Sequence, residues 1–297
     1  MSGDGDGALK HALADLAGAL LPLSLSRLSA EAQQRLAKIP NQINEFGFDP
    51  YGMSPDTLRS GVLPSMLLYR HYFRCEVFGA ERVPPGRALV IANHAGQLPF
   101  DAMMLMMALL LECEPPRIAR AMGEYFLPRL PFLSVLLARG GSMVGTPENC
   151  IHMLQNEECV MVFPEGVRGM NKTFDQRYQL QRFGLGFARL ALATRTPIVP
   201  VGIVGSEEQQ PSFANLEGLG RLLGLPALPI TPGLLAFGPL GMLPLPTKYR
   251  IYFGEPLQLS GDEDAEDATV SDQVERVKSE ISQLLSRGLR ERRGIFS

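Results

Sequence analysis

The sequence predicts an α/β fold with a mixed, mostly parallel central sheet covered by helices on both faces. From about residue 75 onward, short apolar runs alternate with longer segments of helical periodicity, the order expected of strands joined by helices. Two of the short runs pass directly into glycine-containing turns that carry charged residues, as strands do at the carboxyl edge of such a sheet. Amphipathic patterns on either side predict an N-terminal helical segment and a C-terminal amphipathic helix.

The composition is that of a globular protein and argues against several classes of function. Hydrophobic residues make up 45% of the 297 residues, an ordinary share that argues against disorder. The formal net charge of −3 argues against a nucleic-acid partner, because such proteins normally carry a basic excess. The four cysteines are scattered and do not cluster with the histidines. We therefore expect no disulfide framework and no metal site, and a reducing cytoplasm fits best.

The apolar segments are too short for a membrane-spanning helix. None reaches the roughly 18–20 uninterrupted apolar residues that crossing a bilayer requires; residues 12–25, for example, are broken by Asp15 and Pro22. The acidic, glycine-rich start is not a secretory signal pattern. We expect a cytoplasmic protein that associates with a membrane peripherally or monotopically.

Residues 1–74 are predicted to be a helical segment that either packs on the main domain or lies on a membrane surface. Leucine and alanine recur at helical spacing over residues 8–38, and Pro22 divides this stretch into two short amphipathic helices. Residues 40–55 have the Asn, Gly, Asp and Pro content of a connector. Residues 62–72 are mostly apolar and predict a further helix, lying on a bilayer or over the site.

The main domain is predicted to span residues 75–260, and its first motif follows the apolar run 88–92. This run is typical of a buried strand and leads into Asn-His-Ala-Gly-Gln-Leu-Pro-Phe-Asp, which contains His94 and Asp101. A helix is expected from Pro99, with the aspartate in its first turn. A carboxylate bound to one ring nitrogen holds an imidazole in the tautomer that a general base needs. The pair is therefore a candidate catalytic dyad, although the helix dipole alone also favours an aspartate here.

A second buried strand, residues 158–163, ends in Pro-Glu-Gly-Val-Arg-Gly. Glu165 stands there beside Arg168, whose guanidinium can hold a phosphate through two parallel hydrogen bonds. From this segment alone, an internal salt bridge between the two residues explains the pair equally well. Lys172 and Arg182, in the polar segment that follows, are secondary candidates for phosphate binding.

Three motifs follow one another along the chain: Asn-His with a nearby Asp, then Phe-Pro-Glu-Gly-x-Arg about seventy residues later, then Pro-Ile-Val-Pro-Val at 197–201. In this order they resemble the 1-acylglycerol-3-phosphate acyltransferase superfamily, whose members move a fatty acyl group from coenzyme A or acyl carrier protein to a glycerolipid hydroxyl. The resemblance implies that His94 is the base and that Asp101 orients it. It further implies that the turn, here Glu165, Gly166 and Arg168, holds the acceptor's phosphate. It also implies that a proline on the later strand, here Pro200, shapes the pocket.

The sequence departs from the family pattern in two places. The family usually leaves four residues between His and Asp, whereas Ala95–Phe100 makes six here. The loop must therefore bulge or turn differently, and Gly96 is where we expect this. Members also usually carry an arginine on a short strand between the two motifs, where residues 141–147 hold no charge. An acceptor without a phosphate, such as diacylglycerol or a long-chain alcohol, is therefore an alternative to lysophosphatidate.

Several apolar segments of the main domain allow two interpretations. The methionines within residues 103–107 either fill the core or line an acyl chain. Residues 126–137 form either a core helix or an element that dips into a membrane. Thr146 and Pro147 predict the start of another helix.

The remaining strands and the C-terminal unit complete the expected fold. Residues 197–204 and 249–253 predict two more strands. Residues 222–246 contain six prolines among many leucines, too broken for a helix, and we expect them to cover the substrate entrance and touch lipid. Residues 261–297 are predicted to be an acidic linker and an amphipathic helix, whose basic end at 287–293 is suited to anionic head groups.

The expected function is general-base acyl transfer at a membrane surface. The expected partners are an acyl thioester donor, either acyl-CoA or acyl-ACP with its carrier protein, and a glycerolipid acceptor. No cofactor beyond this co-substrate is expected. Hydrolysis of a lipid or thioester at the same dyad is an alternative, although the Gly-x-Ser-x-Gly motif of serine esterases is absent. A catalytically silent lipid-binding protein is a third reading, because of the altered spacing.

Overall fold

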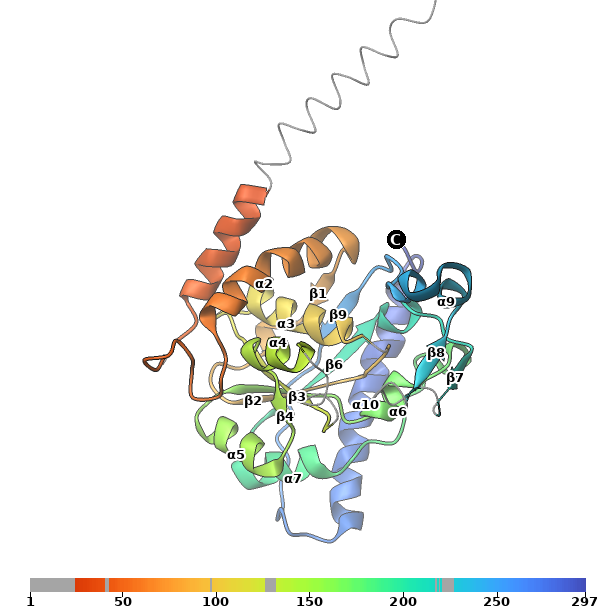
Figure 1. Ribbon diagram of the computed structural model, residues 1–297. Coiled ribbons are helices and arrows are strands. Elements are labelled where there is room, and N and C mark those ends of the chain that lie inside the picture. Colours follow the sequence, from red (N-terminus) through yellow and green to blue (C-terminus); the bar gives the residue numbers. More distant parts are fainter. Residues whose placement is uncertain are drawn as a thin grey trace, which may run out of the picture.

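A seven-stranded sheet forms the centre of the protein (Figure 1). The computed structural model describes residues 25–40, 43–96, 98–125, 132–216, 218, 220 and 227–297. Five neighbouring strands run parallel: β6 (Ile198–Val204), β2 (Ala88–Ala92), β5 (Cys159–Val162), β3 (Ala119–Gly123) and β4 (Met143–Val144). Beyond β6, β9 (Arg250–Phe253) pairs antiparallel and β1 (Glu76–Phe78) pairs parallel with β9. The predicted mixed, mostly parallel sheet is confirmed.

Helices cover both faces of this sheet, as the sequence predicts. One face packs against α2 (Pro55–Leu67), its π-helical continuation Leu68–Tyr72, and α3 (Phe100–Glu112). The other packs against α5 (Pro147–Gln155), α7 (Gly186–Thr194) and α10 (Asp267–Glu291). Alternate residues of a strand point to opposite faces, so in β2 Val90 joins the first cluster and Leu89 the second. The predicted C-terminal amphipathic helix is confirmed as α10, which buries one apolar stripe.

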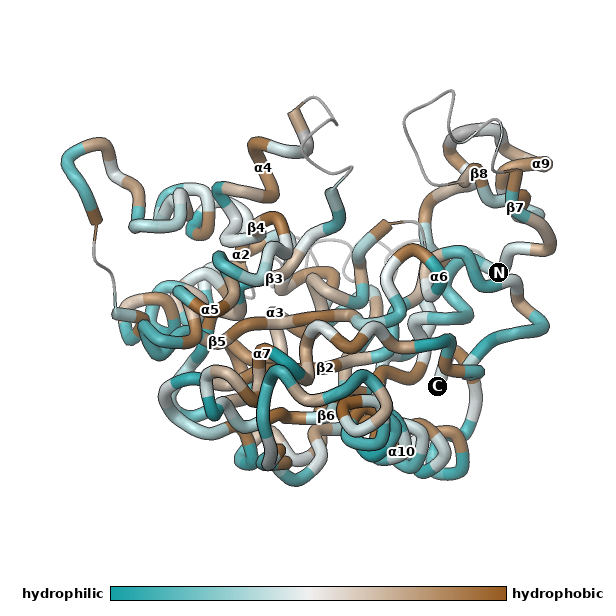
Figure 2. The backbone as a smooth tube through the Cα atoms, turned by 90° about the horizontal axis from the view of Figure 1, so that it is seen from below, coloured by the Kyte–Doolittle hydropathy of each residue, from teal (hydrophilic) through white to brown (hydrophobic). Residues whose placement is uncertain are grey.

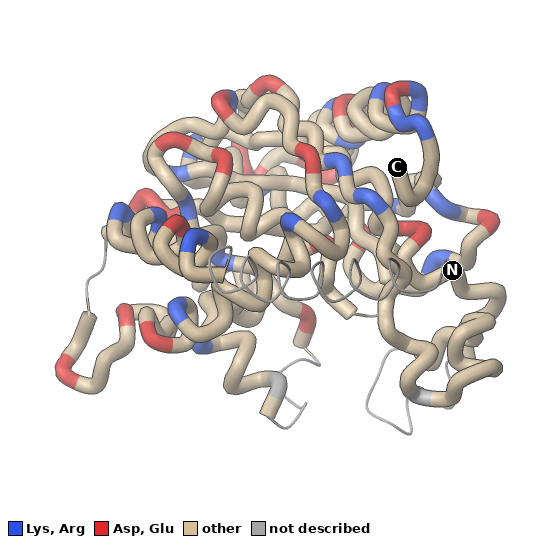
Figure 3. The backbone as a smooth tube through the Cα atoms, turned by 90° about the horizontal axis from the view of Figure 1, so that it is seen from above, with Lys and Arg blue, Asp and Glu red and all other residues tan. Residues whose placement is uncertain are grey.

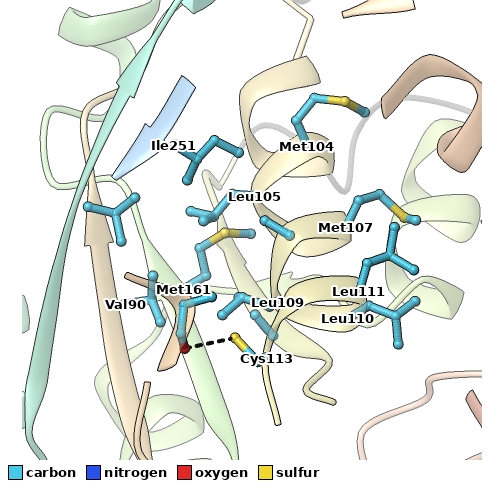
Figure 4. Close-up of a cluster of buried hydrophobic side chains, with 14 of the residues drawn as sticks. Val90, Met104, Leu105, Met107, Leu109, Leu110, Leu111, Cys113, Met161 and Ile251 are labelled. Carbon is cyan, nitrogen blue, oxygen red and sulfur yellow. Dashed lines mark hydrogen bonds between the residues drawn. The ribbon is translucent and has the colours of Figure 1, made fainter. Parts of the chain in front are cut away.

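The methionine-rich helix α3 supplies much of the first core cluster. Met104 and Met107 are buried there together with Val90 of β2 and Met161 of β5 (Figure 4). Methionine is unbranched and flexible, so it adapts to irregular gaps in a packed core. Core filling is therefore the interpretation that these two side chains support.

The N-terminal part also contributes to this cluster where it is described. Residues 25–37 form a helix whose Ala32 is buried, and α2 buries Val62 and Met66. Both helices thus pack on the main domain, one of the two expected arrangements. The predicted break at Pro22 lies outside the described residues, as do residues 126–131 before α4 (Leu133–Arg139). The division of the chain at residues 74 and 260 stays a prediction.

The segment after β6 is more regular than its prolines suggest. β7 (Ala214–Leu216) pairs antiparallel with β8 (Leu228–Ile230), and α9 (Pro232–Phe237) and a 3₁₀ helix, Gly238–Met242, follow. The prediction that residues 222–246 are too broken for a helix is wrong at α9. Pro232 stands at the first helical position, where no N–H is needed, and the Thr231 hydroxyl accepts a hydrogen bond from the N–H of Leu234 (3.0 Å).

None of the helices in the described part of the chain combines the length and the apolar character needed to cross a membrane. The basic C-terminal end is partly used within the protein: Arg287 pairs with Glu291, and Arg292 pairs with the buried carboxylate of Glu208. These two arginines are therefore less available to anionic head groups than the sequence suggests.

Candidate active site

Three neighbouring parallel strands end side by side, and each passes into a polar turn. β2 leads into Asn93 and His94, β5 leads to Glu165, and β6 leads to Ser206 and Glu207. Parallel strands present their carboxyl ends at the same edge of a sheet, so the three turns meet there. This edge is the candidate active site.

His94 and Asp101 are in direct contact. Nδ1 of His94 lies 2.6 Å from Oδ2 of Asp101, which falls in the first turn of α3 as predicted. The six intervening residues are accommodated by a turn that includes Gly96, whose φ of +80° favours glycine. Asp101 is completely buried, and its Oδ2 also accepts a hydrogen bond from the N–H of Ala95 (2.9 Å). The carboxylate is thus fixed by the loop whose histidine it orients.

The surroundings of His94 favour a charged imidazole. Burial lowers the pKa of His94. The charge of Asp101, the hydrogen bond to Asp101 and the charge of Glu165 raise it, and Lys172 lowers it by a smaller amount. The net effect is a pKa above the ordinary value of histidine. The ring of Phe163 stacks on the imidazole, with 4.4 Å between the ring centroids. No hydrogen bond joins Nε2 to any residue in the described part of the chain.

Glu165 is directed into the protein, where it holds the main chain of His94. Its Oε1 accepts a hydrogen bond from the N–H of His94 (2.9 Å), and its Oε2 accepts one from the N–H of Gln181 (2.8 Å). Oε2 also lies 3.3 Å from Nζ of Lys172. Among the described residues no ion pair joins Glu165 to Arg168, so the internal salt bridge considered from the sequence is replaced by one with Lys172.

Lys172 lies between two buried carboxylates. Its Nζ is 2.8 Å from Oε1 of Glu207 as well as 3.3 Å from Glu165, and its side chain is 4% exposed. Glu207 also accepts a hydrogen bond from the N–H of Tyr178 (2.6 Å), and the Asn93 amide donates to it (3.4 Å). Burial raises the pKa of Glu207, and Lys172 opposes this without cancelling it. One ammonium thus links the turns after β5 and β6.

Glu207 and Asn93 were given no role in the sequence analysis. The Asn93 amide makes two hydrogen bonds with the main chain of Ile203, accepting from its N–H (2.8 Å) and donating to its C=O (3.1 Å), which ties the end of β2 to β6. The sequence does contain a pattern that indicates Glu207. Residues 206–210 are polar and follow a predicted strand closely, as do the turns that carry His94 and Glu165.

The other predicted residues lie at different distances from the dyad. Arg168, in the short helix α6 (Val167–Met170), is exposed and donates to the carbonyl of Arg182 (3.4 Å), whose own side chain is also exposed. Gly166 has a φ of +54°, a backbone conformation that favours glycine. Pro200 is buried within β6, where it pairs with Ile91 of β2.

A pocket opens beside the dyad and joins the three turns. Its walls include Gly96 from the His94 loop, Gly169 and Lys172 after β5, Glu207 after β6, and Pro229 of β8. A Cβ at Gly169 would lie 3.1 Å from Cβ of His94, which shows how closely α6 approaches the histidine. The pocket therefore lies next to the loop that carries His94, with Ala95 and Gly96 in its wall. Among the described residues no group of three His, Cys, Asp or Glu side chains could hold a metal ion.

Replacing Lys172 by methionine is expected to lower the free energy of unfolding by roughly 3–5 kcal/mol at pH 8, because two buried carboxylates lose their shared cation. The difference in unfolding free energy between the variant and the native protein should shrink as the pH falls. Without Lys172 the already raised pKa of Glu207 rises further, so the buried carboxyl takes up a proton and loses its unpaired charge. Urea unfolding at pH 8 and pH 5.5 measures both effects. Lys38→Met, at a half-exposed lysine, is the control; equal effects of the two substitutions would contradict the expectation.

This chain is similar to a known protein family and to several known proteins. The sequence model of the family described as Acyltransferase matches residues 74–204. Uncharacterized proteins of Mycobacterium tuberculosis and Mycobacterium leprae are 41% and 40% identical over 261 residues, which is 86% of this chain and 71% and 70% of theirs. The DGAT1/2-independent enzyme synthesizing storage lipids of Gallus gallus is 28% identical over 65% of this chain and 55% of its own length. The crystal structure of the 1-acyl-sn-glycerophosphate (LPA) acyltransferase PlsC from Thermotoga maritima aligns with a TM-score of 0.48 and 19% identity, over 77% of this chain and 82% of that one.

Proposed function

This chain belongs to the acyltransferase family, and we propose that it transfers a fatty acyl group from an acyl thioester to the hydroxyl of a glycerolipid. The contact of 2.6 Å between His94 and Asp101 carries the proposal, because it orients a base beside a pocket. The similarity to the Gallus gallus enzyme named for the synthesis of storage lipids supports a glycerolipid product.

In the proposed reaction His94 acts twice. Its Nε2 takes the proton of the acceptor hydroxyl while Asp101 holds Nδ1, and the oxygen attacks the carbonyl carbon of the thioester. As the carbon–sulfur bond breaks, the imidazolium returns the proton to the leaving sulfur, so that an ester and a free thiol result. Glu165 acts as a positioning residue in this scheme, because its carboxylate holds the N–H of His94. No covalent acyl-enzyme is required.

For the acceptor, we propose a lysophosphatidate whose phosphate binds Arg168. This guanidinium is exposed, has no carboxylate partner among the described residues, and belongs to a helix that approaches His94 closely. A guanidinium binds a phosphate through two parallel hydrogen bonds, which would fix the distance from the phosphate to the reacting hydroxyl.

A neutral acceptor such as diacylglycerol or a long-chain alcohol is the second candidate. Two observations favour it: residues 141–147 carry no charge, and the ammonium of Lys172 is already occupied by two carboxylates. In either case the donor is an acyl thioester on coenzyme A or on acyl carrier protein, and the reaction takes place at a membrane surface where the acceptor is dissolved.

The test supplies purified full-length protein with radiolabelled acyl-CoA or acyl-ACP and vesicles that contain lysophosphatidate, diacylglycerol or a long-chain alcohol. We expect a labelled ester that appears only with an acceptor. Arg168→Ala should lower kcat/KM with lysophosphatidate by about 10- to 100-fold, the loss typical of a hydrogen bond to a charged group, and leave neutral acceptors unaffected. Arg276→Ala, at an exposed site on α10, is the control. Labelled free fatty acid, formed equally with and without acceptor, would identify a hydrolase instead.

A further inference from the structure

Two apolar parts of the chain project from the same side of the molecule. Figure 2 shows α4 and the unit formed by β7, β8 and α9 on one side, and α10 on the opposite side. Residues 227–247 contain no Asp, Glu, Lys or Arg, and the tube of this unit carries neither blue nor red in Figure 3. We refer to α4 with Phe132 as the first apolar projection, and to residues 213–216 together with 227–245 as the second.

The large side chains of both projections are open to solvent. On the first, Phe132 is 91% exposed and Leu136 59%. On the second, Leu235, Phe237 and Leu240 are 72%, 72% and 74% exposed, and Phe213 and Leu243 are each 64% exposed. Single exposed apolar residues are ordinary on protein surfaces, but a group of this size normally marks a binding surface.

The topology places both projections at the edge of the sheet that carries the dyad. α4 follows β3, and β7 follows β6. The strands β3 and β6 run in the same direction. Both connections therefore leave the sheet at its carboxyl edge, where His94 and Glu165 also lie. Pro229 of β8 lines the pocket beside the dyad, so the second projection forms part of the pocket wall.

We infer that the two projections are the surface by which this protein docks on a lipid bilayer, with the pocket facing the lipid. The choice of a bilayer rests on the proposed function, because a glycerolipid acceptor has to reach the pocket from the lipid phase. A bilayer also accepts two separate apolar projections together and requires no charge complement from them, and residues 227–247 offer none. Docking in this orientation brings the acceptor hydroxyl to His94 without a passage through water.

The absence of tryptophan from the sequence allows a direct test. Phe237→Trp and Phe132→Trp each introduce a single indole on one projection, and Phe296→Trp places one at an exposed C-terminal position as a control. With vesicles of phosphatidylcholine and no donor present, we expect the emission of the first two to shift to shorter wavelength and to be quenched by brominated lipid. The control should change little. Quenching of the control alone, or of none of the three, would overturn the inference.

A binding measurement separates this inference from the proposed function. Leu235→Ser/Phe237→Ser/Leu240→Ser should reduce flotation with neutral vesicles by about tenfold or more at low and high salt, because the lost contribution is apolar. Phe296→Ser is the control, and near-unchanged thermal unfolding of each variant excludes misfolding.

Vesicle binding without acyl transfer would defeat the proposed function alone. Acyl transfer together with unchanged vesicle binding of the triple variant would defeat this inference alone. A dimer that forms without vesicles and is lost in the triple variant would assign the surface to a second copy and overturn it.

Discussion

Replacing His94 by alanine is expected to lower kcat/KM for acyl transfer by about 10²- to 10⁴-fold, the contribution typical of a positioned general base. In the native protein Asp101 holds Nδ1 at 2.6 Å, Glu165 holds the main-chain N–H and Phe163 stacks on the ring, so the imidazole has little freedom. In the proposed reaction, alanine removes the group that takes the hydroxyl proton and returns it to the sulfur. Binding of the acceptor through Arg168 should persist, so the loss should fall mainly on kcat.

The fold should survive this substitution. Asp101 would still accept a hydrogen bond from the N–H of Ala95, and Glu165 would still accept one from the main chain at position 94, so no buried carboxylate is left without a partner. His152→Ala is the matched control, since this histidine contacts Tyr51 away from the site. The assay is transfer of labelled acyl groups to lysophosphatidate and to diacylglycerol. Turnover of His94→Ala close to that of the native protein would remove His94 as the base.

The sheet and the dyad were predictable because their signals are local. A buried strand that ends in a polar, glycine-containing turn can be seen within about fifteen residues of sequence, and this pattern located both His94 and Glu165. The extra residues between His94 and Asp101 did not prevent contact, because Gly96 adopts a conformation that lets the loop turn back. Likewise Thr146 caps α5 as predicted, by accepting a hydrogen bond from the N–H of Asn149 (3.2 Å).

The ionic part of the site depends on contacts between distant segments, which no local pattern specifies. Glu207 lies 35 positions from Lys172 along the chain, yet the two meet because the turns after β5 and β6 leave the same edge of the sheet. From the sequence, the Glu165–Arg168 pair could be an internal salt bridge or a phosphate-binding turn. In the folded chain the ion-pair partner of Glu165 is Lys172, a residue that the local pattern does not single out for this contact. Helix α9 departs from the prediction for a different reason: a proline inside a helix destabilises it, but Pro232 stands at the first helical position, where proline is favoured.

Replacing Asp101 by asparagine should lower the limiting rate on the order of 10²-fold or more, because the amide cannot satisfy all three partners of the carboxylate. Asp101 accepts hydrogen bonds from His94 and Ala95 at Oδ2 and from the N–H of Ala102 at Oδ1 (2.8 Å). If the asparagine oxygen replaces Oδ2, its NH₂ group faces the N–H of Ala102. If the amide is turned, its NH₂ favours the His94 tautomer with a proton on Nε2, and that nitrogen can no longer accept one.

The same substitution should also move the pH profile, in a direction that a merely structural effect would not produce. A base works only in its neutral form, so transfer by the native protein should fall as the pH drops through the raised pKa of His94. In Asp101→Asn the charge of Asp101 is lost while burial still lowers the pKa of His94, so this pKa falls and the acid limb of the profile shifts to lower pH. Rates measured from pH 5 to pH 9 test this, with Asp272→Asn on the exposed side of α10 as the control. An acid limb at the same pH in Asp101→Asn and in the native protein would show that another group is the base, because loss of the charge at position 101 must change the pKa of His94.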